Sequence, residues 1–336
     1  MAAILLLHMA GGAIADAPVV HVYSAQKEHL IRPVLDKFTR QTGITVKLLT
    51  GDKAALVTRL AHEGEYTPAD LLLTADIGNL YQATQKGLLQ PIRSDVLNAN
   101  IPAYLRDESG LWYGLTRRAR LLFVRRDTMA DTPEKRLDYT DIANESWHGK
   151  LLIRSSDSVY NQSLMAFMIH HYGEEVALQW AKGVVANLAR APKGGDRDQL
   201  RALAAGEGDV AVANSYYYSM MIAGDASMHD RRVQEAVIPV FPPEGSVGVH
   251  MNIRGGGVTR YADNAEGAIL LLEFLSDEAA QSFFTETNLE YPVNPRIVPH
   301  KALAAMGEMQ VDDTPLSYIG ALQAKAIMLM DDAGWK

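Results

Sequence analysis

The chain has 336 residues, a formal net charge of -8 and a hydrophobic fraction of 48%. These values suit a globular protein of about two ordinary domains, and an acidic chain without a long basic run argues against nucleic acid as its main partner. The sequence contains no cysteine, which excludes thiolate chemistry and cysteine-zinc sites.

The first segment, residues 1–15, is apolar and ends in Ala13-Ile14-Ala15, the small-x-small pattern of a cleavage site. We therefore expect a signal peptide over 1–15 and a mature protein outside the cytoplasm. The positive charge usual at the start of such a signal is missing, and a buried strand is the alternative. No later segment reaches the roughly 18 consecutive apolar residues of a membrane span, so stable membrane insertion is not expected.

Strands and helices are expected to alternate in the first part of the chain. Apolar periodicity and a stop signal at Gly43 predict the order strand Val19–Tyr23, helix 30–38, strand Ile44–Leu49, helix Ala54–Leu60 and strand Leu71–Leu73. This alternation is typical of a parallel sheet, whose ligands lie outside the carboxyl ends of the strands. The loops after Tyr23 and Leu73 are therefore expected to face a cleft.

A second alternating unit is expected from about residue 121 onward. Its predicted elements are strand Leu151–Ile153, helices Ser163–His171, Glu174–Ala189 and Leu200–Ala205, strand Val210–Ala213, strand Val247–Ile253 and helix Ala265–Leu275. The proline-rich segment 239–245 is expected to cross between two lobes. Gly255-Gly256-Gly257 is expected to form a turn, because no complete nucleotide-binding motif surrounds it.

Three tyrosines follow the strand at 210–213, in the string Asn214-Ser215-Tyr216-Tyr217-Tyr218. Successive side chains of a strand point to opposite faces, so neighbouring phenols converge only if the chain turns or enters a helix, which Asn-Ser favours. Tyr160 occupies a similar polar junction between a strand and a helix. These phenols predict an all-oxygen pocket, and packing at the edge of a core remains the alternative.

Such a pocket suits a hard, highly charged cation. A phenol has a pKa of about 10 and binds a metal only when deprotonated, which favours ferric iron. Zinc prefers cysteine or histidine, and calcium prefers carboxylates and carbonyls. Three phenolates would neutralise Fe(3+) and leave coordination positions for water or a small anion, for which Gln26, Lys27, Arg118 and Arg154 are candidate partners. His29 is interpreted as a solvated helix residue and His170-His171 as residues at a helix end, with metal ligation as the alternative.

Catalysis is not expected. The sequence contains neither G-x-S-x-G nor H-E-x-x-H, and no pair of nucleophile and base is apparent.

Eight short strings together resemble a known family. They are Tyr23-Ser24-Ala25-Gln26, Thr67-Pro68-Ala69-Asp70, Thr74-Ala75-Asp76, Gly114-Leu115-Thr116-Arg117-Arg118-Ala119-Arg120, Tyr160-Asn161-Gln162, Gly194-Gly195-Asp196, Asn214-Ser215-Tyr216-Tyr217 and Glu290-Tyr291-Pro292-Val293-Asn294-Pro295. In this order and spacing they resemble the bacterial periplasmic ferric-iron-binding proteins over nearly the whole chain. The resemblance implies an α/β, two-lobed periplasmic binding protein of the type II-like class, with discontinuous lobes joined by crossing strands.

The resemblance also implies roles for individual residues. The metal ligands of the family fall on Tyr160, Tyr216 and Tyr217, whereas Tyr218 becomes a packing residue. Some members add a histidine and an acidic ligand, but this chain has Lys27 and Ala75 at those positions. It is similar instead to the subgroup that binds iron with tyrosines and a carbonate-type anion.

By position, Gln26, Lys27 and Arg118 inherit the anion-binding role, although that subgroup often has arginine where Gln26 stands. The expected lobes comprise residues 16–118 with 246–292, and residues 119–245 with 293–336. The expected function is delivery of ferric iron to an ABC permease of the inner membrane by a monomeric, non-enzymatic binding protein. A phosphonate, a polyamine or an oxyanion bound in the same fold is the alternative.

Overall fold

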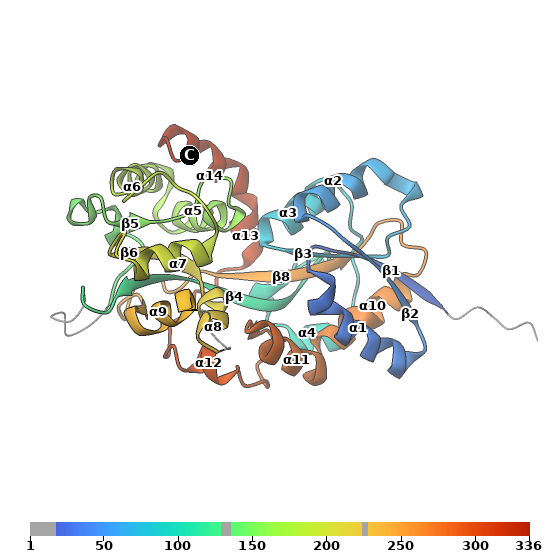
Figure 1. Ribbon diagram of the computed structural model, residues 1–336. Coiled ribbons are helices and arrows are strands. Elements are labelled where there is room, and N and C mark those ends of the chain that lie inside the picture. The colour runs from blue at the N-terminus through green and yellow to red at the C-terminus, as the bar shows by residue number, and fades with distance from the viewer. Residues whose placement is uncertain (1–17, 129–135, 224–227) are drawn as a thin grey trace, which may run out of the picture.

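The computed structural model describes residues 18–128, 136–223 and 228–336, and the predicted signal peptide at 1–15 lies outside these ranges. Two lobes lie side by side and are joined by long strands that run through both (Figure 1). Among the described residues, no helix is long and apolar enough to cross a membrane. The two-lobed α/β fold expected from the sequence is confirmed.

The first lobe contains the predicted parallel sheet. Its strands stand in the order β2-β1-β3, and both pairings are parallel. Helix α1 ends at Gly43, whose φ of 74° places it in the left-handed region, as the stop signal predicts. The elements are β1 (Val19–Ser24), α1 (Glu28–Thr42), β2 (Thr45–Thr50), α2 (Lys53–Glu63), β3 (Leu71–Ala75), α3 (Ile77–Gln85) and α4 (Asp95–Asn100).

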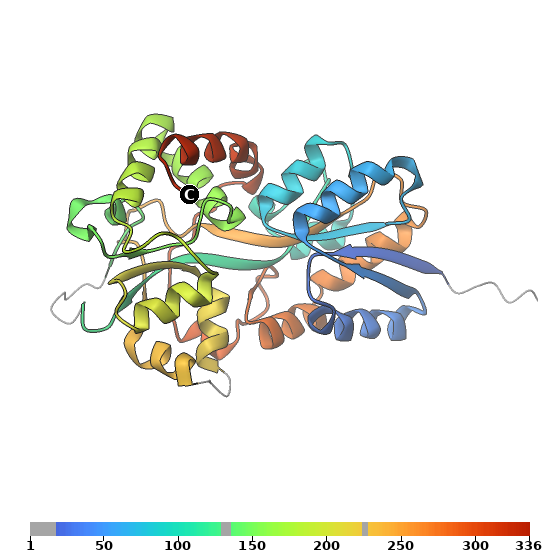
Figure 2. The same ribbon diagram turned by 45° about the horizontal axis from the view of Figure 1, so that its top comes forward.

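Two long strands connect the lobes. They are β4 (Tyr113–Arg125) and β8 (Met251–Val258), which run antiparallel to each other through the middle of the molecule (Figure 2). The first half of β4 pairs with β8, and its second half pairs with strands of the other lobe. The proline-rich segment 239–245 is therefore not the crossing segment, because Pro239 lies within a strand that pairs with Phe123 of β4.

The expectation of a turn at Gly255-Gly256-Gly257 is wrong. These glycines lie inside β8, and each is needed because neighbouring backbone comes very close. A Cβ atom at Gly257 would lie 2.3 Å from the carbonyl oxygen of Leu111, and one at Gly256 would lie 2.6 Å from that of Leu72. The three glycines thus permit close packing of neighbouring backbone against the crossing strand. In a sequence, such a run of glycines looks the same as one that forms a turn.

The second lobe surrounds the other half of the sheet. Its helix α6 ends at Ala186, earlier than predicted, where the amide of Asn187 donates hydrogen bonds to the carbonyls of Ile142 and Asn144. The elements are β5 (Leu151–Leu152), α5 (Val159–Tyr172), α6 (Glu174–Ala186), α7 (Asp196–Ala204), β6 (Val210–Asn214), α8 (Ser215–Ala223), α9 (Met228–Ala236) and β7 (Val237–Val240).

After β8 the chain visits both lobes. Helices α10 and α11 cover the first lobe, α12 and α14 lie against the second, and α13 lies between the lobes, packed on both α3 and α5 (Figure 1). The bounds are α10 (Ala265–Ser276), α11 (Glu278–Asn288), β9 (Tyr291–Pro292), α12 (Lys301–Ala304), α13 (Leu316–Ala321) and α14 (Gln323–Asp332). Short 3-10 turns occupy Gly64–Tyr66, Ala103–Leu105, Asp141–Ala143 and Glu145–Trp147. The residue boundaries expected for the lobes stay a prediction.

Candidate metal centre in the interlobe cleft

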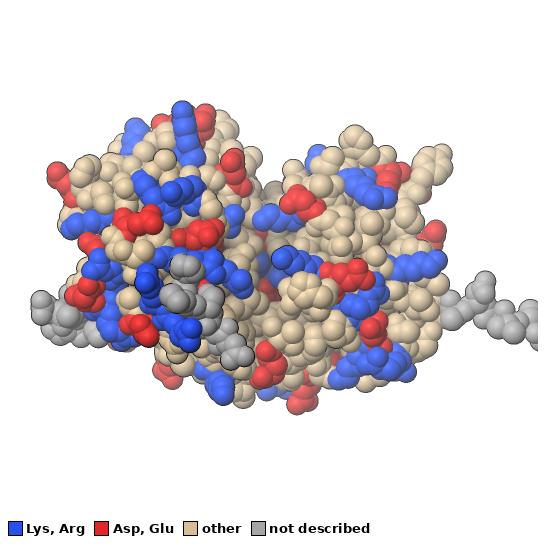
Figure 3. All heavy atoms as spheres, in the orientation of Figure 1, with Lys and Arg blue, Asp and Glu red and all other residues tan. Residues whose placement is uncertain are grey.

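A cleft with a volume of about 570 Å³ lies between the lobes, and both contribute side chains to it. The space-filling view shows the notch between the lobes, with lysine and arginine side chains along it (Figure 3). Its walls include Gln26 and Lys27 from the first lobe, Arg118 from β4, and Tyr160, Tyr216 and Tyr217 from the second lobe. The structure thus brings all six sequence-predicted site residues to one cleft.

The three phenols come from the first turns of two helices. Tyr160 lies in the first turn of α5, and Tyr216 and Tyr217 lie in the first turn of α8, directly after β6. The rings of Tyr216 and Tyr217 have centroids 4.0 Å apart, and Tyr160 lies close enough for its ionisation to act on the pKa of both. The expected helix start after Asn214-Ser215 is confirmed, and it is what allows adjacent phenols to converge.

Tyr160 is surrounded by positive charge. Burial opposes ionisation of its phenol, but the charges of Arg118 and Lys53 outweigh burial and hold the pKa of Tyr160 below its usual value. The four cationic groups around its ring are Lys53 at 4.7 Å, Arg118 at 5.5 Å, Arg154 at 5.5 Å and Arg120 at 6.0 Å from the ring centroid. Tyr160 is therefore the phenol most readily converted to a phenolate.

The other two phenols have the opposite tendency. Burial and the nearby Tyr160 raise the pKa of Tyr217 to about 12. Burial, together with the neighbouring phenols, also raises the pKa of Tyr216. A ligand cation would reverse this tendency, because a positive charge close to a phenol favours its ionised form. Three phenol oxygens whose protons a bound cation would displace are a suitable ligand set for a hard, trivalent cation.

Arg118 is the most buried cationic group of the cleft. Its side chain is 1% exposed, and Nη2 donates a hydrogen bond to the carbonyl of Ile253 in β8. Its Nε and Nη1 atoms have no hydrogen-bond partner among the described residues. A buried guanidinium with two free donors is costly unless an anion binds it, so this site is chemically suited to an anion.

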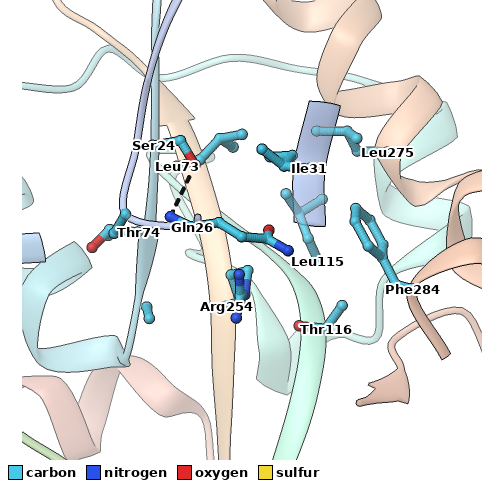
Figure 4. A pocket seen from close by; sticks show the side chains of 12 residues that line it. Ser24, Gln26, Ile31, Leu73, Thr74, Leu115, Thr116, Arg254, Leu275 and Phe284 are labelled. Atoms are coloured by element: carbon cyan, nitrogen blue, oxygen red, sulfur yellow. Dashed lines mark hydrogen bonds between the residues drawn. The ribbon is translucent and has the colours of Figure 1, made fainter. Parts of the chain in front are cut away.

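Gln26 and Lys27 occupy different surroundings at the other wall. The Gln26 side chain is buried, and its amide has no hydrogen-bond partner among the described residues. It extends toward Leu115 in a small side pocket beside the cleft, with a volume of about 10 Å³, room for about one water (Figure 4). Lys27 is exposed at the residue before α1 and lies at the rim of the cleft.

Tyr218 and two of the histidines lie away from the three phenols. The hydroxyl of Tyr218 donates to the carbonyl of Val237 at 3.1 Å, and its ring packs 5.0 Å from that of Phe123. His171 lies at the end of α5, with Nε2 3.4 Å from a carboxylate oxygen of Asp312. In the part of the chain that the structure describes, no group of three or more histidine, aspartate or glutamate residues could hold a metal ion.

Sequence reasoning missed two charged residues of this site. Lys53 begins α2, directly after β2, so the strand-end rule applied to the loops after β1 and β3 would have found it as well. Asp76 is fully buried after β3 and has a φ of 79°, which is rare for a residue with a side chain. Its carboxylate accepts hydrogen bonds from Ser163 of α5 at 2.6 Å and Asn252 of β8 at 2.9 Å. No sequence pattern signalled this contact between lobes.

Comparisons with known proteins agree with this geometry. The family model for a bacterial extracellular solute-binding protein matches residues 67–320. The chain is 39% identical over 327 residues to Iron uptake protein A1 of Synechocystis sp.. The aligned region covers 96% of this chain and 90% of that protein.

Two solved structures have nearly the same fold. A Trichodesmium protein (IdiA, FutA), solved in complex with iron and citrate ligands, has a TM-score of 0.90 and 41% identity, covering 95% of this chain and 100% of the other. The ferric iron-binding protein A of Mannheimia haemolytica, in an open conformation, has a TM-score of 0.88 and 40% identity, covering 95% and 99%.

Proposed function

Because this chain belongs to the family of bacterial extracellular solute-binding proteins, we propose that it binds ferric iron in the interlobe cleft through tyrosinate ligands. The iron is the cargo of the protein, and catalysis plays no part. Relatives at about 40% identity are named for ferric iron or iron uptake, and they match almost the full length of the chain. The resemblance inferred from the eight strings is confirmed by these matches.

The convergence of Tyr160, Tyr216 and Tyr217 at one point is the observation that carries this proposal. All three line the second-lobe wall of one cleft, and the rings of Tyr216 and Tyr217 pack against each other. Positive charge around Tyr160 favours its phenolate, and binding of Fe(3+) supplies the charge that ionises the other two. Three phenolates then neutralise the ion and leave part of its coordination sphere open.

A synergistic anion such as carbonate fills those open positions in this proposal. Arg118 holds it with its two free guanidinium donors, and Gln26 and Lys27 contribute from the opposite wall. Amides and cations cannot serve as ligands to a trivalent cation, so their role is to bind the anion. An anion that contacts both lobes binds the closed arrangement preferentially and shifts the equilibrium toward it.

We further propose that the monomeric, iron-loaded protein works in the periplasm and delivers its cargo to an ABC permease of the inner membrane. This follows from the family and from the printed names of relatives such as the Fe(3+)-binding periplasmic protein of Serratia marcescens, which is 27% identical over 339 residues.

A titration of the purified iron-free protein with ferric iron tests the proposal. Tyrosinate-to-iron charge transfer is expected to give a visible absorption band that saturates at one iron per chain. A colourless protein that leaves the iron to a weak chelator would contradict it.

The ring of positive charge around Tyr160 also favours a second candidate, a phosphonate or another oxyanion as the cargo. Binding of such an anion without any iron, measured by calorimetry, together with a colourless titration, would favour that candidate.

A further inference from the structure

The side chain of Lys53 reaches across the cleft from the first lobe toward the second. It is the first residue of α2 in the first lobe, and its Nζ lies 4.7 Å from the ring centroid of Tyr160 in the second lobe. The start of α2 is fixed by Asp52, whose carboxylate accepts hydrogen bonds from the amides of Ala54 at 2.9 Å and Ala55 at 3.1 Å. The position of the Lys53 backbone is therefore well defined.

The four cations around Tyr160 differ in the partners they already have. Arg120 binds Asp196, Asn161 and Asn214, and Arg154 lies 3.8 Å from the other carboxylate oxygen of Asp196. Lys53, by contrast, forms no ion pair and no hydrogen bond with any other described residue. Arg118 has one hydrogen bond and two free donors. Of these four, only Lys53 and Arg118 form no ion pair with a carboxylate of the described residues.

The acidic groups nearest to these two cations are already engaged. Asp76 accepts hydrogen bonds from Ser163, Asn252 and the backbone amide of Gly78. Glu290 is bound by Thr116 and Arg254. The hydrogen-bond donors to Asp76 are neutral, so its carboxylate still interacts electrostatically with Lys53 and Arg118, but neither cation is in direct contact with an anionic group among the described residues. Both cations are therefore available to bind a small anion such as carbonate.

Gln26 and Lys27, which belong to the first lobe as Lys53 does, offer a weaker arrangement for an anion. The amide of Gln26 extends into its side pocket (Figure 4), and Lys27 is exposed to solvent, where its charge is screened. Lys53 is half-buried, and its ammonium group is held over a ring that belongs to the proposed metal site.

We propose that Lys53 is an anion-binding residue, and that Lys53 and Arg118 together hold the carbonate or carboxylate anion that completes the coordination of iron beside Tyr160. This rests on the proposed function and adds a residue that the sequence did not single out. Because Lys53 belongs to the first lobe and Tyr160 to the second, the anion links the two lobes directly.

Ferric affinity of the purified full chain, with and without bicarbonate, tests this proposal by chelator competition at fixed pH. The wild type is expected to gain affinity from bicarbonate, and Lys53→Met is expected to lose about tenfold or more of that gain, the usual cost of losing an outer-shell partner. The ratio with and without bicarbonate isolates the anion, because any direct effect of the Lys53 charge on Tyr160 enters both measurements.

Lys37→Met is the matched control. Lys37 is also half-buried, on α1, but does not line the cleft, so its variant is expected to keep the full gain. Lys53→Arg keeps the charge and is expected to restore most of the gain, which a purely structural role would not predict.

Each outcome decides a different question. An equal gain from bicarbonate in Lys53→Met and the wild type would overturn the role of Lys53. A coloured wild type without any gain would also overturn it, since no anion would then take part. No colour in any variant would instead contradict the proposed function itself.

Discussion

The two walls of the cleft divide the chemistry between them. The second-lobe wall carries Tyr160, Tyr216 and Tyr217, which lie together before any ligand arrives. The first-lobe wall carries Lys27, the residue before α1, and Lys53, the first residue of α2, and both lie opposite the phenols. The proposed metal ligands thus belong to one wall, and the other wall adds charge. We infer that capture of iron and closure of the lobes are separable steps.

Replacing the phenols is expected to give the largest effect and to break the second-lobe wall. Tyr216→Phe and Tyr217→Phe keep the ring and delete only the ligand oxygen, so each is expected to lower ferric affinity more than about 100-fold, beyond the cost of an outer-shell loss. Chelator competition and the absorption band measure this.

Tyr218→Phe is the matched control within the same helix. It is expected to bind iron normally and to lose about 1 kcal/mol of unfolding free energy, because the hydroxyl that donates to Val237 is removed. Unchanged affinity and colour in both Tyr216→Phe and Tyr217→Phe would disprove the ligand assignment.

Acidification is expected to weaken binding steeply. Tyr217, with its pKa raised to about 12, and Tyr216, with its pKa also raised, are protonated at neutral pH, so each releases a proton when iron binds. Affinity is therefore present at higher pH and is lost as pH falls, by at least about 100-fold per pH unit across the neutral range. Chelator competition at several pH values gives this slope, and a slope near zero would contradict tyrosinate ligation.

Replacing Arg118 is expected to separate the contribution of the phenol ligands from that of the anion-binding charge. Arg118→Ala is expected to keep the tyrosinate colour but to lower affinity about 10- to 100-fold in bicarbonate, and by less in its absence, since the anion loses its buried partner. The four measurements compare wild type and variant with and without bicarbonate. Equal affinity in all four would remove the anion and leave water in the open positions.

The hydrogen bond between the lobes is expected to give the smallest effect. Ser163→Ala removes the donor to Asp76, which disfavours the arrangement seen here by about 1 kcal/mol and lowers ferric affinity less than about tenfold. Small-angle scattering of the iron-free protein measures the accompanying opening. Ser219→Ala is the control, because the hydrogen-bond partner of that buried hydroxyl within the described part of the chain is the sulfur of Met306, at 3.9 Å. Identical scattering in both variants would show that this contact does not hold the lobes.

Local signals in the sequence were sufficient for most of the site. The alternation of elements predicted the parallel sheet, and the Asn214-Ser215 pair predicted the helix start that lets Tyr216 and Tyr217 converge. These features depend on neighbours in the chain, through periodicity, capping and strand ends, so they can be read without the fold. Lys53 follows the end of β2, so the rule that ligands lie at the carboxyl ends of parallel strands also indicates this residue.

Contacts between distant segments were decided by the tertiary structure alone. Gly255, Gly256 and Gly257 resemble a turn, and only the approach of β3 and the chain before β4 shows why side chains are excluded there. The charge beside Tyr160 comes from elements up to about a hundred residues away, and whether Lys53 or Lys27 lies over that ring depends on how the lobes meet. The sequence by itself determined which residue types could bind a ferric ion. Their mutual distances, and therefore their charges, came from long-range packing that no local pattern encodes.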